Sequence, residues 1–270
     1  MYRQENNGVR HPYCVTLFAS PMGHDVGRVA EILMGWLEKT GLFQTRIVGV
    51  CPQAEEGIHD FMQNRKEVKR QDLFIFECPD DEWKDPEDRR LLEETVAEGT
   101  PILFCHGLHP CFRDWPEMEK MIGLLWRQTA FHGDFNTCPV HIQAHEHPIT
   151  KGVEDFQTED ELFCRLENVW NVPMEVLATA WSDPERESRW GFKGSGMEEP
   201  ILTTGTYGKA RTVDFLLGHI WPFYTGHGLM ETTAIAYEPP QVKTLFLRSC
   251  EWTITGEVKD VLRWEGREAK

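Results

Sequence analysis

GTPILFCHGLHP, residues Gly99–Pro110, is the stretch that decides the fold. Its first half, from Pro101 to Cys105, is apolar and uncharged, which is typical of a central parallel strand covered on both faces. His106 and Gly107 follow where that strand ends. Ligands of open α/β sheets bind at the carboxyl ends of the strands, so His106 is a candidate for chemistry. The alternative is a histidine satisfied inside the core, with Gly107 only turning the chain.

Strands and helices alternate on the amino-terminal side of this stretch. The spacing of apolar residues predicts strands over 13–18, 45–50 and 72–76, helices over 29–41 and 86–98, and a short helix within 52–70. Together with the strand at 101–105, they give four strands that alternate with helices. This order predicts a three-layer, doubly wound α/β fold of flavodoxin type, with a mostly parallel sheet between the helices.

The pattern changes in the second half of the chain, where strand-like segments follow one another. The expected elements there are helices over 115–125 and 242–254, strands over 140–143, 161–167, 175–181, 200–206 and 211–217, an irregular stretch over 133–139, a loop over 183–199 and a polar tail over 257–270. Consecutive strands of this kind predict an antiparallel extension of one sheet edge. No repeat or linker divides the sequence, so we expect one domain over 1–270, with its core at about 13–256.

The charge of the chain narrows the range of its partners. Acidic side chains outnumber basic ones among the 270 residues and give a formal net charge of -16. Such a surface repels nucleic acid and anionic membranes on average, so we expect neither as a partner. The N-terminus lacks an apolar signal segment, and no apolar run reaches the ~20 residues that cross a bilayer, which predicts a cytoplasmic protein.

The eight cysteines show no CxxC pair, so their spacing indicates neither a disulfide framework nor a structural zinc site. We expect them to be reduced and mostly within the core. Cys105 precedes the turn at His106, and it would need a neighbouring base to become a thiolate nucleophile. Its place inside the apolar run predicts a side chain that points into the core instead.

Two further histidines are expected at the same sheet edge as His106. His24 lies in the loop after the strand at 13–18, and His219 follows the strand at 211–217. Because loops that leave one edge of a parallel sheet open into one crevice, we expect the three imidazoles to converge. They could hold zinc or another divalent metal, or they could form a metal-free acid/base set.

His141, His145 and His147 form a second histidine-rich segment, which invites a metal interpretation. Pro148 ends the local strand before all three could share one face. Because the ligands of a catalytic metal usually come from separate segments, we do not assign a metal to these three.

Several segments together resemble the trehalose-utilisation, or ThuA-like, family, whose fold is a variant of the class I glutamine amidotransferase fold. The segments that carry the resemblance are the His24–Asp25 loop, GTPILFCHGLH at 99–109, HPITKGVEDF at 147–156, DELF at 160–163, VLATA at 176–180, YGKAR at 207–211, LGH at 217–219 and Trp252. None of them is specific by itself, whereas their shared order over most of the chain is. The sequence departs from the family pattern at Ala210, at Phe163 and in a long insertion between Ile220 and Gln241.

In true amidotransferases the position of His106 carries the cysteine nucleophile, so the resemblance implies that this chain has no glutaminase activity. The resemblance also implies that His24, His106, Glu161 and His219 surround one crevice, which makes these four the candidate catalytic residues. An imidazole can act as a base or bind a metal, and the three histidines are the candidate metal ligands. Glu161 has a plainer alternative, because a glutamate at a strand start usually caps or pairs.

Candidate substrate-binding residues lie around this crevice. His109 follows the turn, and Arg211 could bind an anionic group, although a structural ion pair is the more common role of such an arginine. Trp221 in the insertion could stack on the apolar face of a sugar ring, although core packing is the more common role of a single aromatic side chain. Tyr207 at the start of YGKAR completes the set.

The family name associates the chain with carbohydrate metabolism. We therefore expect an enzyme that acts on a small-molecule sugar or keto-sugar by histidine acid/base chemistry, as an isomerase, a lyase or a hydrolase. A divalent metal could polarise a ketone of that substrate, and no nucleotide cofactor is expected. The alternative is a non-catalytic binding or assembly module that kept the fold and lost the nucleophile. In either case the chain could form a homo-oligomer.

Overall fold

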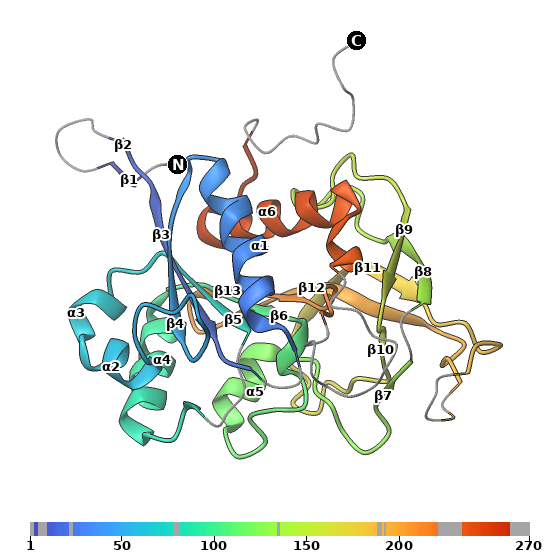
Figure 1. The fold of residues 1–270 in the computed structure, drawn as a ribbon, viewed down its shortest axis with the longest axis horizontal. Helices are drawn as coiled ribbons and strands as arrows, with labels where there is room; N and C mark the ends of the chain where they lie inside the picture. Colours follow the sequence, from blue (N-terminus) through green and yellow to red (C-terminus); the bar gives the residue numbers. More distant parts are fainter. Residues whose placement is uncertain are drawn as a thin grey trace, which may run out of the picture.

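A nine-stranded sheet lies at the centre of the fold (Figure 1). This computed structural model describes residues 3–4, 10–21, 24–77, 82–133, 136–187, 191, 193–220 and 234–259. In spatial order the strands are β4 (Phe43–Gly49), β3 (Tyr13–Ala19), β5 (Leu73–Glu77), β6 (Ile102–Cys105), β13 (Ala210–Phe215), β12 (Glu198–Tyr207), β11 (Met174–Trp181), β8 (Asn136–Ile142) and β9 (Phe156–Asp160). The first five are parallel, and the other four continue the sheet with antiparallel pairings. The predicted mixed α/β class, with a parallel core and an antiparallel extension, is confirmed.

Helices cover both faces of this sheet and give the three layers of Figure 1. They are α1 (Val26–Lys39) and α6 (Pro240–Thr255) on one face, and α2 (Ile58–Gln63), α3 (Arg65–Val68), α4 (Pro86–Glu98) and α5 (Pro116–Ile122) on the other. Each face buries its own cluster of apolar side chains against the sheet. Burial of this apolar area is the main favourable contribution to the stability of such layers.

Short elements complete the described part of the chain. They are the 3-10 turns η2 (His106–Leu108) and η3 (Ile235–Tyr237), and two antiparallel pairs, β1 (Arg3–Gln4) with β2 (Arg10–His11) and β7 (Phe131–His132) with β10 (Phe163–Cys164). Figure 1 shows the β7–β10 pair beside the β8 and β9 end of the large sheet. Of the described helices, none is long and apolar enough to cross a membrane.

Strand β6 lies between β5 and β13 and is buried on both faces. Ile102 and Phe104 pack into the apolar cluster under α4 and α5, whereas Leu103 and Cys105 pack into the cluster under α1 and α6. Each of these side chains is at most 2% exposed. Because the side chains on both faces of β6 are apolar, the strand has no polar face to present to solvent. The first polar side chain is that of His106, directly after the strand ends.

Helix α1 begins at Val26, three residues before the expected start. The side chain of Asp25 accepts a hydrogen bond from the backbone N–H of Arg28 (3.2 Å), which caps the first turn. Val26 is buried together with Val29 and Leu33, so the apolar stripe of the helix extends one turn further than the spacing alone indicated. This early start leaves His24 directly before the helix, beside the end of β3.

The expected strand over 161–167 is wrong in its bounds. Strand β9 ends at Asp160, and β10 covers only Phe163–Cys164. Glu161 interrupts the strand because its buried carboxylate turns toward histidines of other segments. Arg165 then adopts a positive φ of 57°, which ends β10. Apolar alternation in the sequence could not reveal a break that long-range polar contacts create.

The expectation of an irregular stretch over 133–139 is also wrong, because β8 already begins at Asn136. Pro139 lies within β8 and pairs with β9 through Gln157, while the pairing of β8 with β11 starts only at Val140. The proline ring therefore lies where the strand has a partner on one side, and its missing N–H removes no second ladder bond.

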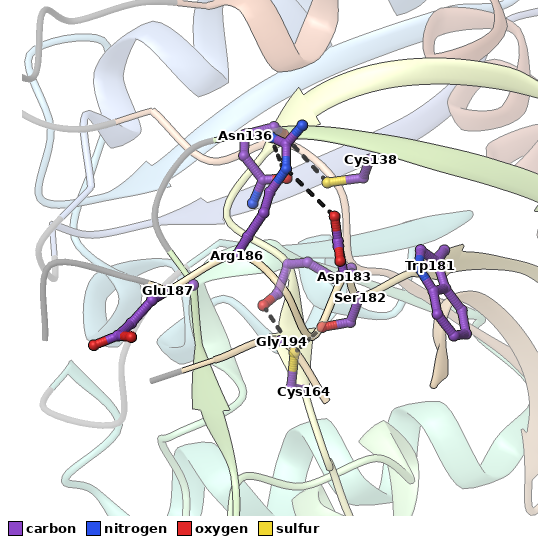
Figure 2. A pocket seen from close by; sticks show the side chains of 11 residues that line it. Asn136, Cys138, Cys164, Trp181, Ser182, Asp183, Arg186, Glu187 and Gly194 are labelled. Atoms are coloured by element: carbon purple, nitrogen blue, oxygen red, sulfur yellow. Dashed lines mark hydrogen bonds and ion pairs between the residues drawn. The ribbon is translucent and has the colours of Figure 1, made fainter. Parts of the chain in front are cut away.

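Two other expected segments differ in length. The helix expected over 115–125 ends at Ile122, because Gly123 adopts a φ of 85° that a right-handed helix cannot continue. The loop expected over 183–199 ends where β12 begins, at Glu198. Asp183, Arg186, Glu187 and Gly194 of this loop line a cavity of about 320 Å³ together with residues of β8 and β10 (Figure 2).

Candidate functional site

His106 begins the turn that follows β6, and its side chain is 1% exposed. Its Nδ1 lies 2.6 Å from the backbone oxygen of Leu216. A carbonyl oxygen can only accept, so Nδ1 carries the proton and the neutral ring presents a lone pair at Nε2. The imidazole also stacks on Phe163, with ring centroids 4.1 Å apart. These two contacts fix the direction in which Nε2 points.

His219 follows β13 and faces His106 at the same sheet edge. Its Nδ1 lies 2.9 Å from Nε2 of His106. The buried carboxylate of Asp160 accepts the backbone N–H groups of Gly218 (2.7 Å), His219 (3.1 Å) and Glu161 (2.8 Å). Asp160 therefore holds the segment after β13 in place and thereby positions the imidazole of His219.

His24, directly before α1, is the third member of the cluster. Its ring centroid lies 4.4 Å from that of His219 and 5.6 Å from that of His106. One ring nitrogen from each of the three histidines lies within 4.8 Å of the others. The structure thus brings together side chains from the ends of β3, β6 and β13, which lie far apart in the sequence.

Gly107 lets these side chains approach the turn. A Cβ atom at this position would lie 2.4 Å from Oε1 of Glu77 and 2.8 Å from Nδ1 of His24. Any other residue would collide with both groups, so the glycine is needed for close approach rather than only for turning the chain. Glu77, the last residue of β5, is thereby identified as a neighbour of the cluster, which no sequence motif indicated.

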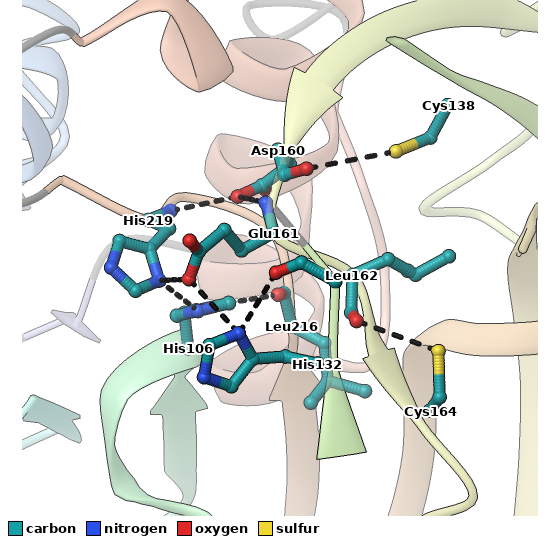
Figure 3. Close-up of polar contacts among 10 residues, drawn as sticks. His106, His132, Cys138, Asp160, Glu161, Leu162, Cys164, Leu216 and His219 are labelled. Atoms are coloured by element: carbon teal, nitrogen blue, oxygen red, sulfur yellow. Dashed lines mark hydrogen bonds and ion pairs between the residues drawn. The ribbon is translucent and has the colours of Figure 1, made fainter. Parts of the chain in front are cut away.

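Glu161 and His132 extend the cluster, as Figure 3 shows. Oε2 of Glu161 lies 3.3 Å from Nδ1 of His219 and 3.2 Å from Nδ1 of His132. The segment DELF indicated Glu161, whereas no recognisable motif surrounds His132, which lies in the two-residue strand β7. Only the pairing of β7 with β10, which flanks Glu161, reveals its place.

Burial shifts the pKa values of the three histidines, Glu77 and Asp160 toward their neutral forms. Loss of solvation lowers the pKa of His24 to about 4 and those of His106 and His219 well below the ordinary value, and repulsion among the imidazoles adds to the effect. Burial raises the pKa of Glu77 to about 7 and that of Asp160 to about 6. At neutral pH the three imidazoles are therefore uncharged and able to donate electron pairs.

A cavity borders the cluster at His24. A cavity of about 510 Å³ is lined by His24, by the first turn of α1 and by residues 50–53. The volume lies within the usual range of about 300 to 1,000 Å³ for small-molecule pockets. His24 lines this space, whereas His106 and His219 do not line it and are each at most 3% exposed.

Of the candidate substrate-binding residues, His109 is 1% exposed and lies beneath the turn. Its Nδ1 contacts the backbone oxygen of Leu124 (2.9 Å), and its Nε2 lies 3.1 Å from Oδ1 of Asp214. Burial alone would lower the pKa of His109, but the contacts with Asp214 and with the backbone oxygen of Leu124, together with the charge of Glu77, outweigh it and raise that pKa. His109 therefore forms a buried ion pair with Asp214 and does not face the cavity beside His24.

Arg211 and Tyr207 lie at the opposite edge of the sheet from the histidines. Arg211 donates to the backbone oxygens of Thr253 (2.9 Å) and Ile254 (2.8 Å), at the end of α6. The hydroxyl of Tyr207 donates to Glu117 on α5 (2.6 Å). The structure thus does not bring these two residues into the cluster. Trp221, the fourth candidate, and most of the insertion lie outside the described residues.

Two histidines of the second histidine-rich segment have other partners in the structure. Nδ1 of His141 pairs with Glu198 (2.9 Å), and the ring of His147 packs against Trp252, with centroids 4.7 Å apart. Within the described ranges, no group of potential metal ligands includes His141, His145 or His147. The cluster at the carboxyl edge differs from this segment in joining histidines of three separate loops.

Comparisons with known proteins agree with this architecture. The model of the ThuA family, described as trehalose utilisation, matches residues 15–253. No curated protein sequence matches the chain. The crystal structure of a ThuA-like protein from Parabacteroides merdae superposes with a TM-score of 0.74 at 24% identity, covering 92% of each chain. The crystal structure of a ThuA-like protein from Bacteroides uniformis superposes with a TM-score of 0.66 at 14% identity, covering 95% of this chain and 97% of the other.

A cytoplasmic protein from Salmonella typhimurium has a TM-score of 0.54 at 13% identity, with 89% of this chain and 98% of that chain covered. At such identities the structural likenesses show the fold alone. The family match is broader evidence, because it spans β3, β6 and β13, the strands that carry the three histidines. The resemblance that the sequence segments indicated is confirmed, and the chain belongs to the ThuA family.

Proposed function

We propose that the protein is an enzyme of carbohydrate metabolism that acts on a sugar or an oxidised keto-sugar, with the histidine cluster as its active centre. The observation that supports this most is the convergence of His24, His106 and His219 within 4.8 Å, at the edge where α/β folds bind ligands. A cavity of about 510 Å³ borders the cluster at His24. The substrate class rests on the family's association with trehalose utilisation.

The donor set of the cluster fits a divalent metal such as zinc. Its three imidazoles are uncharged at neutral pH, and zinc binds neutral imidazole nitrogen. The contact from Nδ1 of His106 to a backbone carbonyl is the kind of outer hydrogen bond that orients metal-ligating histidines. A metal held by these residues would polarise a carbonyl oxygen of the substrate.

The chain's own residues account for binding and proton movement. His24 borders the cavity as a neutral imidazole, so without a metal it is the group placed to take a proton next to a substrate carbonyl. Glu161 contacts His219 and His132 and orients both rings. Proton removal next to a ketone leads to isomerisation or elimination, and hydrolysis would use the same groups to activate water.

The absence of glutaminase activity belongs to the same proposal. Cys105 is 2% exposed inside β6, and burial raises the pKa of its thiol far above the ordinary value. A protonated, enclosed thiol is a poor nucleophile. The position of His106 at the turn after a central strand supports an origin of the fold in the class I glutamine amidotransferase type, with imidazole in place of the thiol. Ammonia release from glutamine that disappears in Cys105→Ser would contradict this.

The test combines metal binding with a reaction that needs no knowledge of the product. We expect zinc to bind the purified protein in calorimetry and His106→Ala to weaken that binding about 100-fold or more. We also expect proton NMR in D₂O to detect exchange of the C–H next to the carbonyl in a panel of ketohexoses and keto-glycosides. Arg211→Ala is the matched control, because Arg211 lies at the other sheet edge, and should retain both signals.

A binding or assembly module is the alternative. It predicts histidines that neither converge nor titrate unusually, and the geometry and pKa shifts of the cluster weigh against it. Zinc binding without exchange or turnover across the whole panel would favour this alternative. We further expect a cytoplasmic protein with a small-molecule carbohydrate as its ligand, no nucleic-acid or membrane partner and no nucleotide cofactor; association into a homo-oligomer is compatible with both functions.

A further inference from the structure

A second cavity lies on the other side of the segment that carries Glu161. Along 161–164 the side chains alternate: Glu161 and Phe163 contact the histidines, whereas Leu162 and Cys164 line the cavity of about 320 Å³. Figure 3 shows the two sides, with Cys138 and Cys164 opposite the histidines. The segment is thus a shared wall, and the second cavity is separate from the proposed active centre.

An exposed tryptophan forms one side of this cavity. Trp181 is the last residue of β11 and is 38% exposed, although large aromatic side chains are usually buried more completely. It lines the space that Figure 2 shows. The flat apolar face of an indole ring suits the C–H face of a sugar ring, and such rings dominate the energetics of contact with amphipathic ligands.

The rest of the rim is polar and carries both signs of charge. Asn136, Asp183, Arg186 and Glu187 line it together. Nε of Arg186 lies 3.6 Å from Oδ2 of Asp183, and its Nη1 donates to Oδ1 of Asn136 (3.3 Å). Carboxylates only accept, guanidinium only donates and the amide does both, so this rim matches a ligand whose hydroxyl groups donate and accept in turn. The two carboxylates disfavour an anionic ligand.

Contacts among Ser182, Cys164 and the loop that contains Gly194 hold the bottom of the cavity in one conformation. The hydroxyl of Ser182 accepts the backbone N–H of Ser195 (2.9 Å) and contacts the sulfur of Cys164 (3.2 Å). A Cβ atom on Gly194 would lie 2.1 Å from the backbone oxygen of Asp183, so the two ends of the loop can meet this closely only with glycine there. A site that is already shaped loses little conformational freedom when a ligand binds.

We propose that this second cavity binds one neutral sugar ring, stacked on Trp181 and held through its hydroxyl groups by Asp183, Arg186 and Asn136. This site goes beyond the proposed function, because it stands apart from the histidine cluster and requires neither metal nor catalysis. Its volume of about 320 Å³ suits a single ring rather than a long oligosaccharide.

Ligand-observed NMR with defined probes tests the proposal. The probes are the methyl glycosides of glucose, galactose and mannose, with glucose 6-phosphate as the charged analogue and myo-inositol as a polyol that is not a sugar. We expect at least one neutral glycoside to bind saturably, with the strongest saturation transfer on its ring C–H protons. Trp181→Ala should weaken that binding about tenfold, as for an aromatic residue that dominates a contact.

Matched variants distinguish sugar binding in this cavity from sugar binding elsewhere on the protein. Trp170→Ala removes a tryptophan that is similarly exposed (42%) on another part of the chain and should leave binding unchanged. Arg186→Gln changes an exposed loop residue and should weaken binding several-fold, about threefold to tenfold, so the test does not depend on Trp181→Ala folding. His106→Ala should retain the binding even if it abolishes zinc binding and turnover.

Five outcomes would overturn the proposal. The first four are the absence of saturable binding by every neutral glycoside, equal losses in Trp181→Ala and Trp170→Ala, tighter binding of glucose 6-phosphate than of the neutral sugars, and binding of myo-inositol alone. Loss of glycoside binding in His106→Ala with retention in Trp181→Ala would move the sugar to the histidine cluster, which rejects this site and leaves the proposed function intact.

Discussion

Both ends of the central strands, the carboxyl edge and the amino edge of the sheet, carry polar side chains. The side chains at the two ends have different roles. At the carboxyl edge of β6 and β13, His106 and His219 are buried, uncharged and directed at one another. At the amino edge, Arg211 and Tyr207 donate to fixed acceptors on α6 and α5. The difference lies in the partners, because hydrogen bonds at the amino edge hold helices in place, whereas those at the carboxyl edge orient side chains toward a shared space. Residue type alone did not show which edge binds a ligand and which edge holds helices in place.

The largest expected effect comes from the carboxylate that organises the carboxyl edge. Asp160 is 1% exposed and accepts three backbone N–H groups. Asp160→Ala leaves these buried donors without an acceptor, so we expect the free energy of unfolding to fall by about 4 kcal/mol in urea titrations. Asp160→Asn retains one oxygen acceptor and should lose about half as much. Equal losses in the two variants would mean that the charge, rather than the acceptor, holds the edge.

A pH-dependent effect of intermediate size is expected at Glu77. Its folded-state pKa is raised from 4.5 to about 7, so the buried carboxyl contributes stability at low pH that is lost as pH rises through about 7. A shift of this size corresponds to about 3 kcal/mol. Because Glu77→Gln cannot ionise, its stability relative to the natural chain should rise by up to about 3 kcal/mol from about pH 5 to about pH 8.

Urea unfolding at both pH values, with a chelator present to remove metal, measures this difference. Glu117→Gln is the control, because contacts with Lys120 and Tyr207 lower the pKa of that partly exposed carboxyl. A stability difference for Glu77→Gln that does not change with pH would show that Glu77 is solvated and would weaken the contrast between the edges.

At the amino edge we expect a smaller loss of stability with no effect on ligands. Arg211→Ala removes two hydrogen bonds to the last carbonyl groups of α6 and should lower the free energy of unfolding by about 2 kcal/mol. Zinc affinity should stay within about twofold of the natural chain, since Arg211 lies at the opposite sheet edge from the histidine cluster. A folded Arg211→Ala protein that no longer binds zinc would show that the two edges are coupled.

The smallest expected effect is at Tyr207. Tyr207→Phe removes one hydrogen bond to a partly exposed carboxylate on α5, so we expect a loss of about 1 kcal/mol or less. The midpoint of thermal unfolding should fall slightly, and keto-sugar exchange should continue at an unchanged rate. A fall in the exchange rate without a change in the melting midpoint would assign Tyr207 to substrate binding after all.

Prediction from the sequence succeeded where local pattern carries the information. The apolar run at 101–105 identified β6, and helical spacing identified α1, α4 and α6 within a few residues. It failed where a distant contact overrides the pattern, as at Glu161, whose buried carboxylate divides an expected strand. It also failed to find His132 and Glu77, which belong to no motif, and it assigned no role to Asp160, the first residue of DELF. All three acquire their roles only from neighbours in space.

By itself the sequence determined the α/β class and the edge at which His24, His106 and His219 meet, because strand order and apolar spacing constrain which loops share an edge. The shared order of several sequence segments identified the family. Only the tertiary structure decided which atoms face each other. His106 contacts Leu216 and His219, which lie 110 and 113 residues away along the chain. Such partners follow from the packing of distant segments in a buried environment, and the same packing directs Arg211 to the end of a helix rather than to a ligand.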